Sequence, residues 1–158
     1  MTKILFSKIV EFATGIEDAG YEFYNKISSK TKDPKIKRIF TSLAKAELQH
    51  KKTFANMLKD KSVKINTDLF PEEYYFEYAS KVIFDKEKLE NEYRMIDSPI
   101  DALNFGIRRE LDTILYYQEL NRMIDENKIE TQVENIIKEE RKHFMKLTNY
   151  KEELENQK

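Results

Sequence analysis

Apolar residues recur every three or four positions in four long stretches of the chain, at about residues 3–30, 33–60, 98–127 and 128–155. This spacing places the apolar side chains of each stretch on one face of an α-helix. Charged residues fill the positions between them, which leaves each helix a solvated face. The pattern predicts four long helices packed around one shared core.

Two of the predicted helices begin with the same local signal. Asp33-Pro34 opens the second helix, and Ser98-Pro99 opens the third, with Asp101 in its first turn. In such a pair the polar side chain caps free amide groups and proline occupies the first helical position. The candidate core positions of the third helix are Leu103, Phe105, Ile107, Leu111, Ile114, Leu115, Leu120 and Ile124.

Residues 61–97 break the periodic pattern, and we interpret them as a long crossover with one or two short helices, one of them near residues 86–93. An aromatic cluster in this stretch indicates either packing of the crossover or a homodimer interface. With only 3 glycines and 3 prolines, the chain lacks the turns of a β fold. The predicted fold class is all-α, an antiparallel four-helix bundle with a long crossover between helices 2 and 3, in a single domain over residues 1–158. The aromatic cluster consists of Tyr74, Tyr75, Phe76 and Tyr78.

Composition and charge exclude several classes of protein. The chain carries 28 basic and 29 acidic residues, a net charge of −1, so no nucleic-acid surface is expected. The absence of cysteine excludes disulfides, thiolate zinc sites and iron–sulfur clusters in this sequence. No segment reaches the ~20 apolar residues of a membrane helix. Because the N-terminal apolar run is too short for a signal-peptide core, a cytoplasmic location is expected.

The sequence contains an internal repeat with a period of 93 residues. In each half, a glutamate is followed 30 residues later by the motif Glu-x-x-His, and the only 2 histidines of the chain occupy equivalent places. Matched spacing of this kind indicates that the two halves contribute the same chemistry to one site. The shift superposes Glu17 on Glu110, Glu47 on Glu140 and His50 on His143.

The spacing also predicts where these side chains meet. In a helical hairpin, residues at equal distance from the turn lie at the same height, and the midpoints of the two glutamate pairs, residues 32 and 125, fall in the predicted turns. At ~1.5 Å per residue each glutamate lies ~22 Å from its turn, near the middle of the bundle. Glu-x-x-His presents both side chains on one helix face. All six side chains are therefore expected to converge at one level.

A cluster of four buried carboxylates needs compensating charge, because the groups repel one another and lose their hydration. Two divalent cations neutralise four carboxylates, and neutral imidazoles complete each coordination sphere. Ligation rich in oxygen with one nitrogen per metal suits iron or manganese better than copper or structural zinc. The arrangement is that of two-metal carboxylate bundles. We predict two iron ions, with manganese or a mixed pair as alternatives, bound by Glu17, Glu47, His50, Glu110, Glu140 and His143.

The motifs Glu17-x6-Tyr24, Glu47-x-x-His50, Glu110-x6-Tyr117 and Glu140-x-x-His143 resemble the rubrerythrin-type branch of the ferritin-like superfamily, in its small single-domain form without a rubredoxin domain. The resemblance covers the four long helices. It implies a ferritin-like bundle with a di-iron centre that reacts with peroxide or dioxygen, as in defence against oxidative stress. Because the sequence has no cysteine for a second redox centre, the electrons are expected from a separate donor such as a rubredoxin-like protein.

One ligand position departs from the family pattern. Rubrerythrins carry an additional glutamate one turn after the third-helix ligand, where this chain has Thr113. The site is therefore expected to be symmetric, closer to the ligation of bacterioferritin. No fifth helix follows the fourth, so a storage shell of the ferritin type is not expected.

Side chains beside the predicted ligands have two interpretations each. Tyr24 and Tyr117 lie two turns beyond a glutamate ligand on the same helix face. Their hydroxyls either hydrogen-bond a ligand carboxylate or donate an electron, or the rings simply pack as core aromatics. The flanking charges are expected at the solvated surface, where the arginines could pair with a neighbouring acid. These charges are Asp18, Glu139, Arg108 and Arg109.

Three functions are compatible with these expectations. The leading hypothesis is a di-iron oxidoreductase that reduces hydrogen peroxide or dioxygen. The second is an iron-binding protein for iron handling, with ferroxidase activity incidental to uptake. The third is a non-enzymatic helical interaction module with a structural metal site, because one fold hosts many functions.

Overall fold

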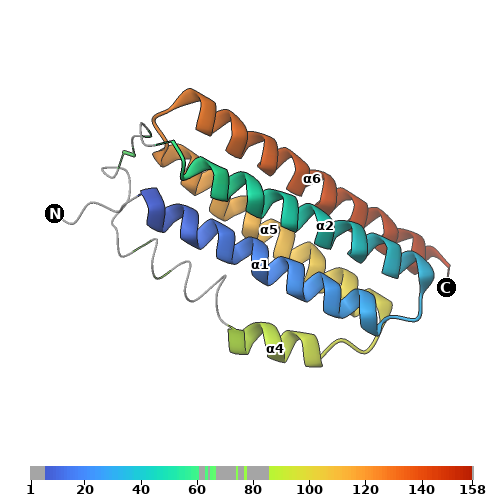
Figure 1. Ribbon diagram of the computed structural model, residues 1–158. Helices are drawn as coiled ribbons and strands as arrows, with labels where there is room; N and C mark the ends of the chain where they lie inside the picture. The colour runs from blue at the N-terminus through green and yellow to red at the C-terminus, as the bar shows by residue number, and fades with distance from the viewer. Residues whose placement is uncertain are drawn as a thin grey trace.

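Within the residues that the computed structural model describes, 6–60, 63, 65, 66, 74, 77 and 86–157, the fold has four long helices and a shorter helix over residues 86–94. The predicted all-α class is confirmed, and the crossover contains the short helix expected near residues 86–93. Tyr74 is helical, whereas Tyr75, Phe76 and Tyr78 lie outside the described residues. The helices, shown in Figure 1, are α1 (Phe6–Lys30), α2 (Pro34–Met57), α4 (Lys86–Arg94), α5 (Pro99–Met123) and α6 (Asn127–Asn156).

Neighbouring helices of the bundle run antiparallel. The chain forms two hairpins, α1 with α2 and α5 with α6, and these pack so that α1 lies beside α5 and α2 beside α6. Because α2 ends at one end of the bundle and α5 begins at the other, the chain crosses the full length of the bundle between them (Figure 1). Among the described helices, none combines the length and the apolar character that a bilayer crossing requires.

The predicted helix starts are present. The side chain of Asp33 accepts hydrogen bonds from the backbone amides of Lys35 and Ile36, and Ser98 forms a reciprocal capping box with Asp101. Helix α5 ends at Met123, about one turn before the predicted end. Its continuation is extended at Ile124, which forms an isolated antiparallel bridge with Ile65 of the crossover. This pairing ends the helix and fastens the crossover to that end of the bundle.

The core consists of two apolar clusters separated by a polar layer at mid-height. One cluster is built from Ile9, Phe54, Met123, Ile137 and their neighbours, at the end of the bundle where α1 begins. The other gathers residues from the opposite halves of the same four helices. The six predicted metal ligands lie between the clusters in sequence on every helix. Each ligand is thus held by packed apolar layers above and below.

The expected core face of α5 is partly wrong. Leu111 and Leu115 are each 48% exposed, although both were predicted to face the core. The buried positions are set instead by Glu110 and Tyr117, which are seven residues apart and point inward together. Since neighbouring residues on a helix are rotated by about 100°, Leu111 turns toward the surface when Glu110 faces the core. Leu103, Leu120 and Ile124 are buried as predicted, and Phe105, Ile107 and Ile114 are partly buried.

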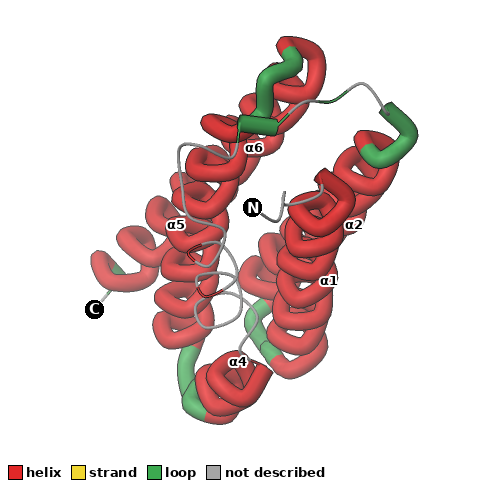
Figure 2. Tube along the Cα trace, turned by 90° about the vertical axis from the view of Figure 1, so that its left-hand side faces the viewer, coloured by secondary structure: helices red, strands yellow, loops and turns green. Residues whose placement is uncertain are grey.

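Helix α4 lies outside the bundle, beside α1 and α5 (Figures 1 and 2). The Nζ atom of Lys26 on α1 lies 2.9 Å from a carboxylate oxygen of Glu90 on α4. The ring of Tyr93 packs against the second apolar cluster and lies beneath the ammonium groups of Lys26 and Lys30. These contacts fix α4 over the two helices that carry Glu17 and Glu110.

Candidate metal centre

The structure brings all six predicted ligands together at the middle of the bundle. Their donor atoms form two overlapping groups, and within each group the atoms lie within 4.8 Å of one another. Glu47 and Glu140 belong to both groups, so each can bridge two cations. Each position has three carboxylates and one imidazole. Position 1 comprises Glu17, Glu47, His50 and Glu140, and position 2 comprises Glu47, Glu110, Glu140 and His143.

The four carboxylates are almost completely buried, with relative exposures of 0–2%. Three oxygens of these four carboxylates have no hydrogen-bond partner within the described part of the chain, and these are the Oε2 atoms of Glu17, Glu47 and Glu110. An unpartnered buried acceptor is costly, and a charged one more so. Cations placed among these oxygens would satisfy them, so the donor set fits a pair of divalent metals.

The imidazole rings turn the same nitrogen toward the carboxylates. His50 Nδ1 lies 3.0 Å from Glu140 Oε1, and His143 Nδ1 lies 3.0 Å from Glu140 Oε2. His50 Nδ1 is also 3.5 Å from Glu17, and His143 Nδ1 is 3.8 Å from Glu110. The two rings are stacked, with centroids 6.0 Å apart. In both halves Nδ1 is therefore the nitrogen available to a metal.

Tyr24 and Tyr117 link the two halves of the centre. The hydroxyl of Tyr24 donates to Glu110 Oε1 at 2.5 Å, and that of Tyr117 donates to Glu17 Oε1. Burial and the adjacent carboxylates raise the pKa of both phenols well above the usual value, so both remain protonated donors. Each bond engages the Oε1 atom, and the Oε2 atom of each glutamate has no hydrogen-bond partner among the described residues. The hydrogen-bonding interpretation of these tyrosines therefore agrees with the geometry.

Burial and mutual interactions shift the pKa values of the carboxylates and imidazoles of the centre. Burial, followed by the charge of Glu140, raises the pKa of Glu47 and Glu110 above the usual carboxyl range. Burial also acts to raise the pKa of Glu140, but hydrogen bonds from the two histidines lower it below the usual value. Burial acts to lower the pKa of His50 and His143, yet the carboxylates raise these values to about 11 and about 9. Without metal, both imidazoles therefore carry a proton at neutral pH.

We expect metal binding to release these protons, because only a neutral imidazole can coordinate. Since the pKa of His143 is about 9 and that of His50 about 11, metal affinity should keep rising as the pH increases from 7 to 9. Each proton released adds a gain of about tenfold in apparent affinity per pH unit. Calorimetric titration with Co²⁺ in buffers of different ionisation enthalpy counts the protons. An affinity that levels off near the ordinary histidine pKa of ~6.5 would contradict this expectation.

Glu139 is exposed, as the sequence suggested, but its carboxylate also pairs with a predicted ligand histidine. Its carboxylate lies 2.6 Å from His50 Nε2, the nitrogen on the outer side of the ring, although the side chain of Glu139 remains 53% exposed. A carboxylate at this place orients a ligand histidine and fixes its tautomer. The signal was weak because Glu139 precedes Glu140 and points about 100° away on its own helix. Only the packing of α6 against α2 brings it to His50.

Arg109 differs from the expected surface charge. Its guanidinium packs over Gly20 of α1, where Nη2 donates to the backbone carbonyl of Ile16 at 2.5 Å. Burial acts to lower the pKa of Arg109, but Tyr24, Glu47, Glu110 and Glu17 raise it above the usual value, with effects that decrease in this order. A permanent cation therefore lies beside the cluster, in a space that the absent side chain of Gly20 leaves open.

Gly20→Ala is expected to destabilise the protein by ~1–3 kcal/mol through overpacking, although alanine gains ~1 kcal/mol over glycine in a helix. A Cβ atom at this position would lie 2.6 Å from Arg109 Nη2 and 3.0 Å from the carboxyl carbon of Glu47. Chemical unfolding measures the effect, with Gly15→Ala on the same helix as the control. Adding Arg109→Met should restore most of the loss. Equal stability of the two alanine variants would show that the guanidinium moves away without cost.

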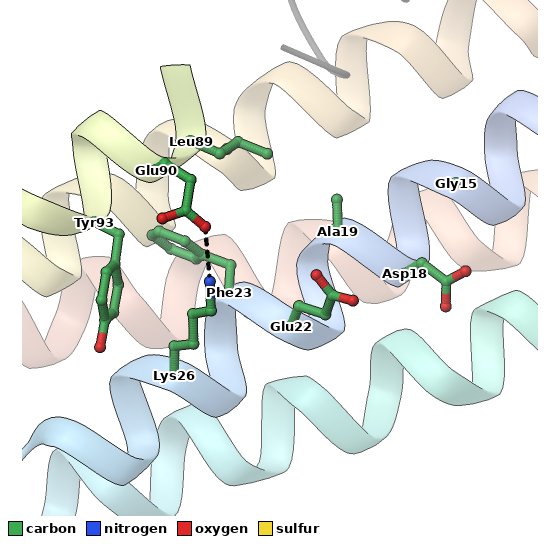
Figure 3. Close-up of a pocket in the computed structure, with 9 residues that line it drawn as sticks. All are labelled: Gly15, Asp18, Ala19, Glu22, Phe23, Lys26, Leu89, Glu90 and Tyr93. Atoms are coloured by element: carbon green, nitrogen blue, oxygen red, sulfur yellow. Dashed lines mark hydrogen bonds and ion pairs between the residues drawn. The ribbon is translucent and has the colours of Figure 1, made fainter. Parts of the chain in front are cut away.

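A separate cleft of about 350 Å³ lies between α1 and α4 (Figure 3). Ala19, Phe23 and Leu89 provide apolar walls, and the Lys26–Glu90 ion pair crosses it. None of the six cluster residues lines this cleft. Asp18 stands at its edge, but the carboxylate pairs with Lys51 Nζ at 2.6 Å and is half exposed. As expected from the sequence, Asp18 is a surface charge that points away from the cluster.

Comparisons with known proteins agree with this geometry. A family profile for rubrerythrin matches residues 8–151. Among solved structures, the chain is similar to one described as a ferritin-like diiron-carboxylate protein from Thermotoga maritima, with a TM-score of 0.69 and 25% sequence identity over 97% of this chain and 98% of that chain. A comparison with curated proteins gives no significant match.

Proposed function

Because the chain belongs to the rubrerythrin family and has the fold of ferritin-like diiron-carboxylate proteins, we propose that it is an oxidoreductase that reduces hydrogen peroxide or dioxygen with electrons from a separate donor. The observation that carries this proposal is the buried cluster of four carboxylates and two imidazoles in two overlapping groups. Three of its carboxylate oxygens have no hydrogen-bond partner among the described residues. Two divalent cations would neutralise the four carboxylates.

Iron is the metal that we propose for both positions, because one imidazole and three carboxylates suit Fe²⁺ and the family is of the diiron type. Two iron ions bound there would supply the electrons and the open coordination positions for an oxygen substrate. Manganese satisfies the same donor set and is the alternative to be tested by metal analysis.

The chain's own residues would orient the ligands and control protons. Tyr24 and Tyr117 hold Glu110 and Glu17 through Oε1 and remain protonated at neutral pH because burial raises their pKa. Their hydroxyl protons are thus available next to the ligand carboxylates. The apolar clusters above and below exclude water from the carboxylates, which strengthens electrostatic interactions within the centre. The His143 side chain, 15% exposed, is the ligand with the most contact with solvent.

Anaerobic reconstitution followed by rapid mixing tests this proposal. Protein reconstituted with Fe²⁺ should hold two irons per chain and should be oxidised more rapidly by hydrogen peroxide than by buffer without oxidant. Turnover should then continue when a rubredoxin-like protein supplies electrons. Glu47→Gln is the matched control, since it removes one charge shared by both positions. If the protein binds two irons but does not turn over with any electron donor, the proposed oxidoreductase activity is contradicted, whereas the proposed metal site is not.

An iron-handling protein with ferroxidase activity is the second candidate. Thr113 is 4% exposed at the position where rubrerythrins carry an additional carboxylate, so the described centre holds four carboxylates in a symmetric arrangement. Size-exclusion chromatography with iron analysis separates the candidates. An assembly of many subunits that takes up many irons per chain would favour iron handling over catalysis.

A further inference from the structure

The two halves of the metal centre match in their ligands and differ in the residues around them. The period of 93 residues relates every ligand of position 1 to one of position 2. Any difference in metal affinity between the two positions must therefore come from surrounding residues that the repeat does not preserve. Two such differences lie directly beside the cluster, and one of them distinguishes the two positions.

The first difference concerns the outer nitrogen of each histidine. His50 Nε2 lies 2.6 Å from the Glu139 carboxylate, so the ring can donate outward while Nδ1 faces the cluster. The repeat places Ala46 on α2 where α6 has Glu139, and a methyl group accepts no hydrogen bond. The His143 side chain is also more exposed, 15% against 3% for His50. A carboxylate behind a histidine ligand raises its basicity and holds its orientation, and position 2 lacks this support.

The second difference is a cation on one side only. Arg109 occupies the place that Ile16 holds in the other half of the repeat. A Cβ atom at Gly20 would lie 2.6 Å from Arg109 Nη2 and 3.0 Å from the carboxyl carbon of Glu47, so the guanidinium lies near a carboxylate that both positions share. A fixed positive charge beside a carboxylate opposes the binding of a second cation there. Because Glu47 belongs to both positions, the difference at the outer histidine nitrogen is the one that separates them, and it weakens position 2 relative to position 1.

From this asymmetry we propose that the two positions differ in metal affinity. A divalent metal fills the position of Glu17 and His50 first and the position of Glu110 and His143 second. The inference rests on the proposed metal binding and adds an order of loading to it. Glu139 acts as the positioning residue that makes the first position tighter. The chain then passes through a defined one-metal state at low metal concentration. Loss of an outer-shell partner costs about 10–100-fold in metal affinity, and we expect the low end because Glu139 is half exposed.

Calorimetric titration of the metal-free full chain with Co²⁺, followed in parallel by visible absorption of the bound metal, tests the order. The wild type should show two binding events whose affinities differ at least tenfold. Glu139→Gln should weaken the first event about tenfold and make the two events similar. Ala46→Glu, which supplies the missing carboxylate on α2, should strengthen the second event. Glu152→Gln, an exposed substitution elsewhere on α6, should leave both events unchanged.

The outcomes separate this inference from the proposed function. Two events of equal affinity in the wild type, or an unchanged first event in Glu139→Gln, would overturn the unequal positions and leave the metal centre standing. No Co²⁺ binding at all would overturn both. Since Ala46→Glu is expected to gain affinity, misfolding cannot imitate its predicted result. Circular dichroism of each variant checks that the helices remain.

Discussion

Glu140→Gln is expected to remove both metal positions at once. Glu140 is shared by the two groups, and its two oxygens lie 3.0 Å from His50 Nδ1 and 3.0 Å from His143 Nδ1. The amide keeps the shape of the side chain but removes the charge and offers only one oxygen. We expect the affinity of both positions to fall by more than the ~100-fold that loss of an outer partner can cause. Metal analysis after equilibrium dialysis against Co²⁺ measures the stoichiometry.

The contrast with Glu17→Gln makes this result specific. Glu17 belongs to position 1 alone, so its amide variant should retain one metal per chain at position 2. Glu152→Gln on the surface of α6 should retain two. A Glu140→Gln protein that still binds two metals with wild-type affinity would show that Glu140 does not bridge. Binding of one metal by both buried variants would instead mean that the two positions do not share this carboxylate.

The sequence predicted the cluster because the ligand residues recur at regular spacings along the chain. Two Glu-x-x-His motifs and two further glutamates at matched distances from their turns determine height along the bundle without any knowledge of side-chain packing. The cap signals at Asp33 and Ser98 determine where two helices begin, which fixes that register. The presence of each helix, its position in the sequence and the inward direction of the ligands follow from local rules of this kind.

The residues that the sequence did not predict depend on contacts between helices. Glu139 meets His50 only because α6 packs against α2, and Arg109 turns inward only because Gly20 of the neighbouring helix leaves room for the guanidinium. Apolar character alone likewise misplaced Leu111, whose helix is rotated by the inward-facing Glu110. In each case the deciding neighbour is remote in sequence, so spacing along one helix gives no sign of it.

The buried charges that suit the cluster to metal binding oppose folding of the metal-free chain. Burial and the charges of Glu140 and Glu17 raise the pKa of Glu47 well above the usual carboxyl value, which reflects the cost of ionising it there. A buried polar atom without a hydrogen-bond partner costs ~1–3 kcal/mol, and Glu47 Oε2 has no such partner among the described residues. A ligand that binds only the folded state adds stability, about 4 kcal/mol for one site at 1,000 times its Kd. Stability and metal affinity should therefore respond in opposite directions to the same substitution.

Glu47→Met is expected to make the metal-free protein more stable than the metal-free wild type by ~1–3 kcal/mol, because it removes the buried Oε2 atom that has no hydrogen-bond partner among the described residues. At about 2–4 °C per kcal/mol for a chain of this size, the melting temperature should rise by several degrees. With Co²⁺ in excess the order should reverse, because the wild type gains about 4 kcal/mol per site, whereas the variant has lost a shared ligand of both positions. Thermal unfolding with and without metal measures all four states, with Glu152→Met as the surface control. If metal-free Glu47→Met melts below the metal-free wild type, the carboxylate contributes to folding on its own, and the opposition between buried charge and stability is wrong.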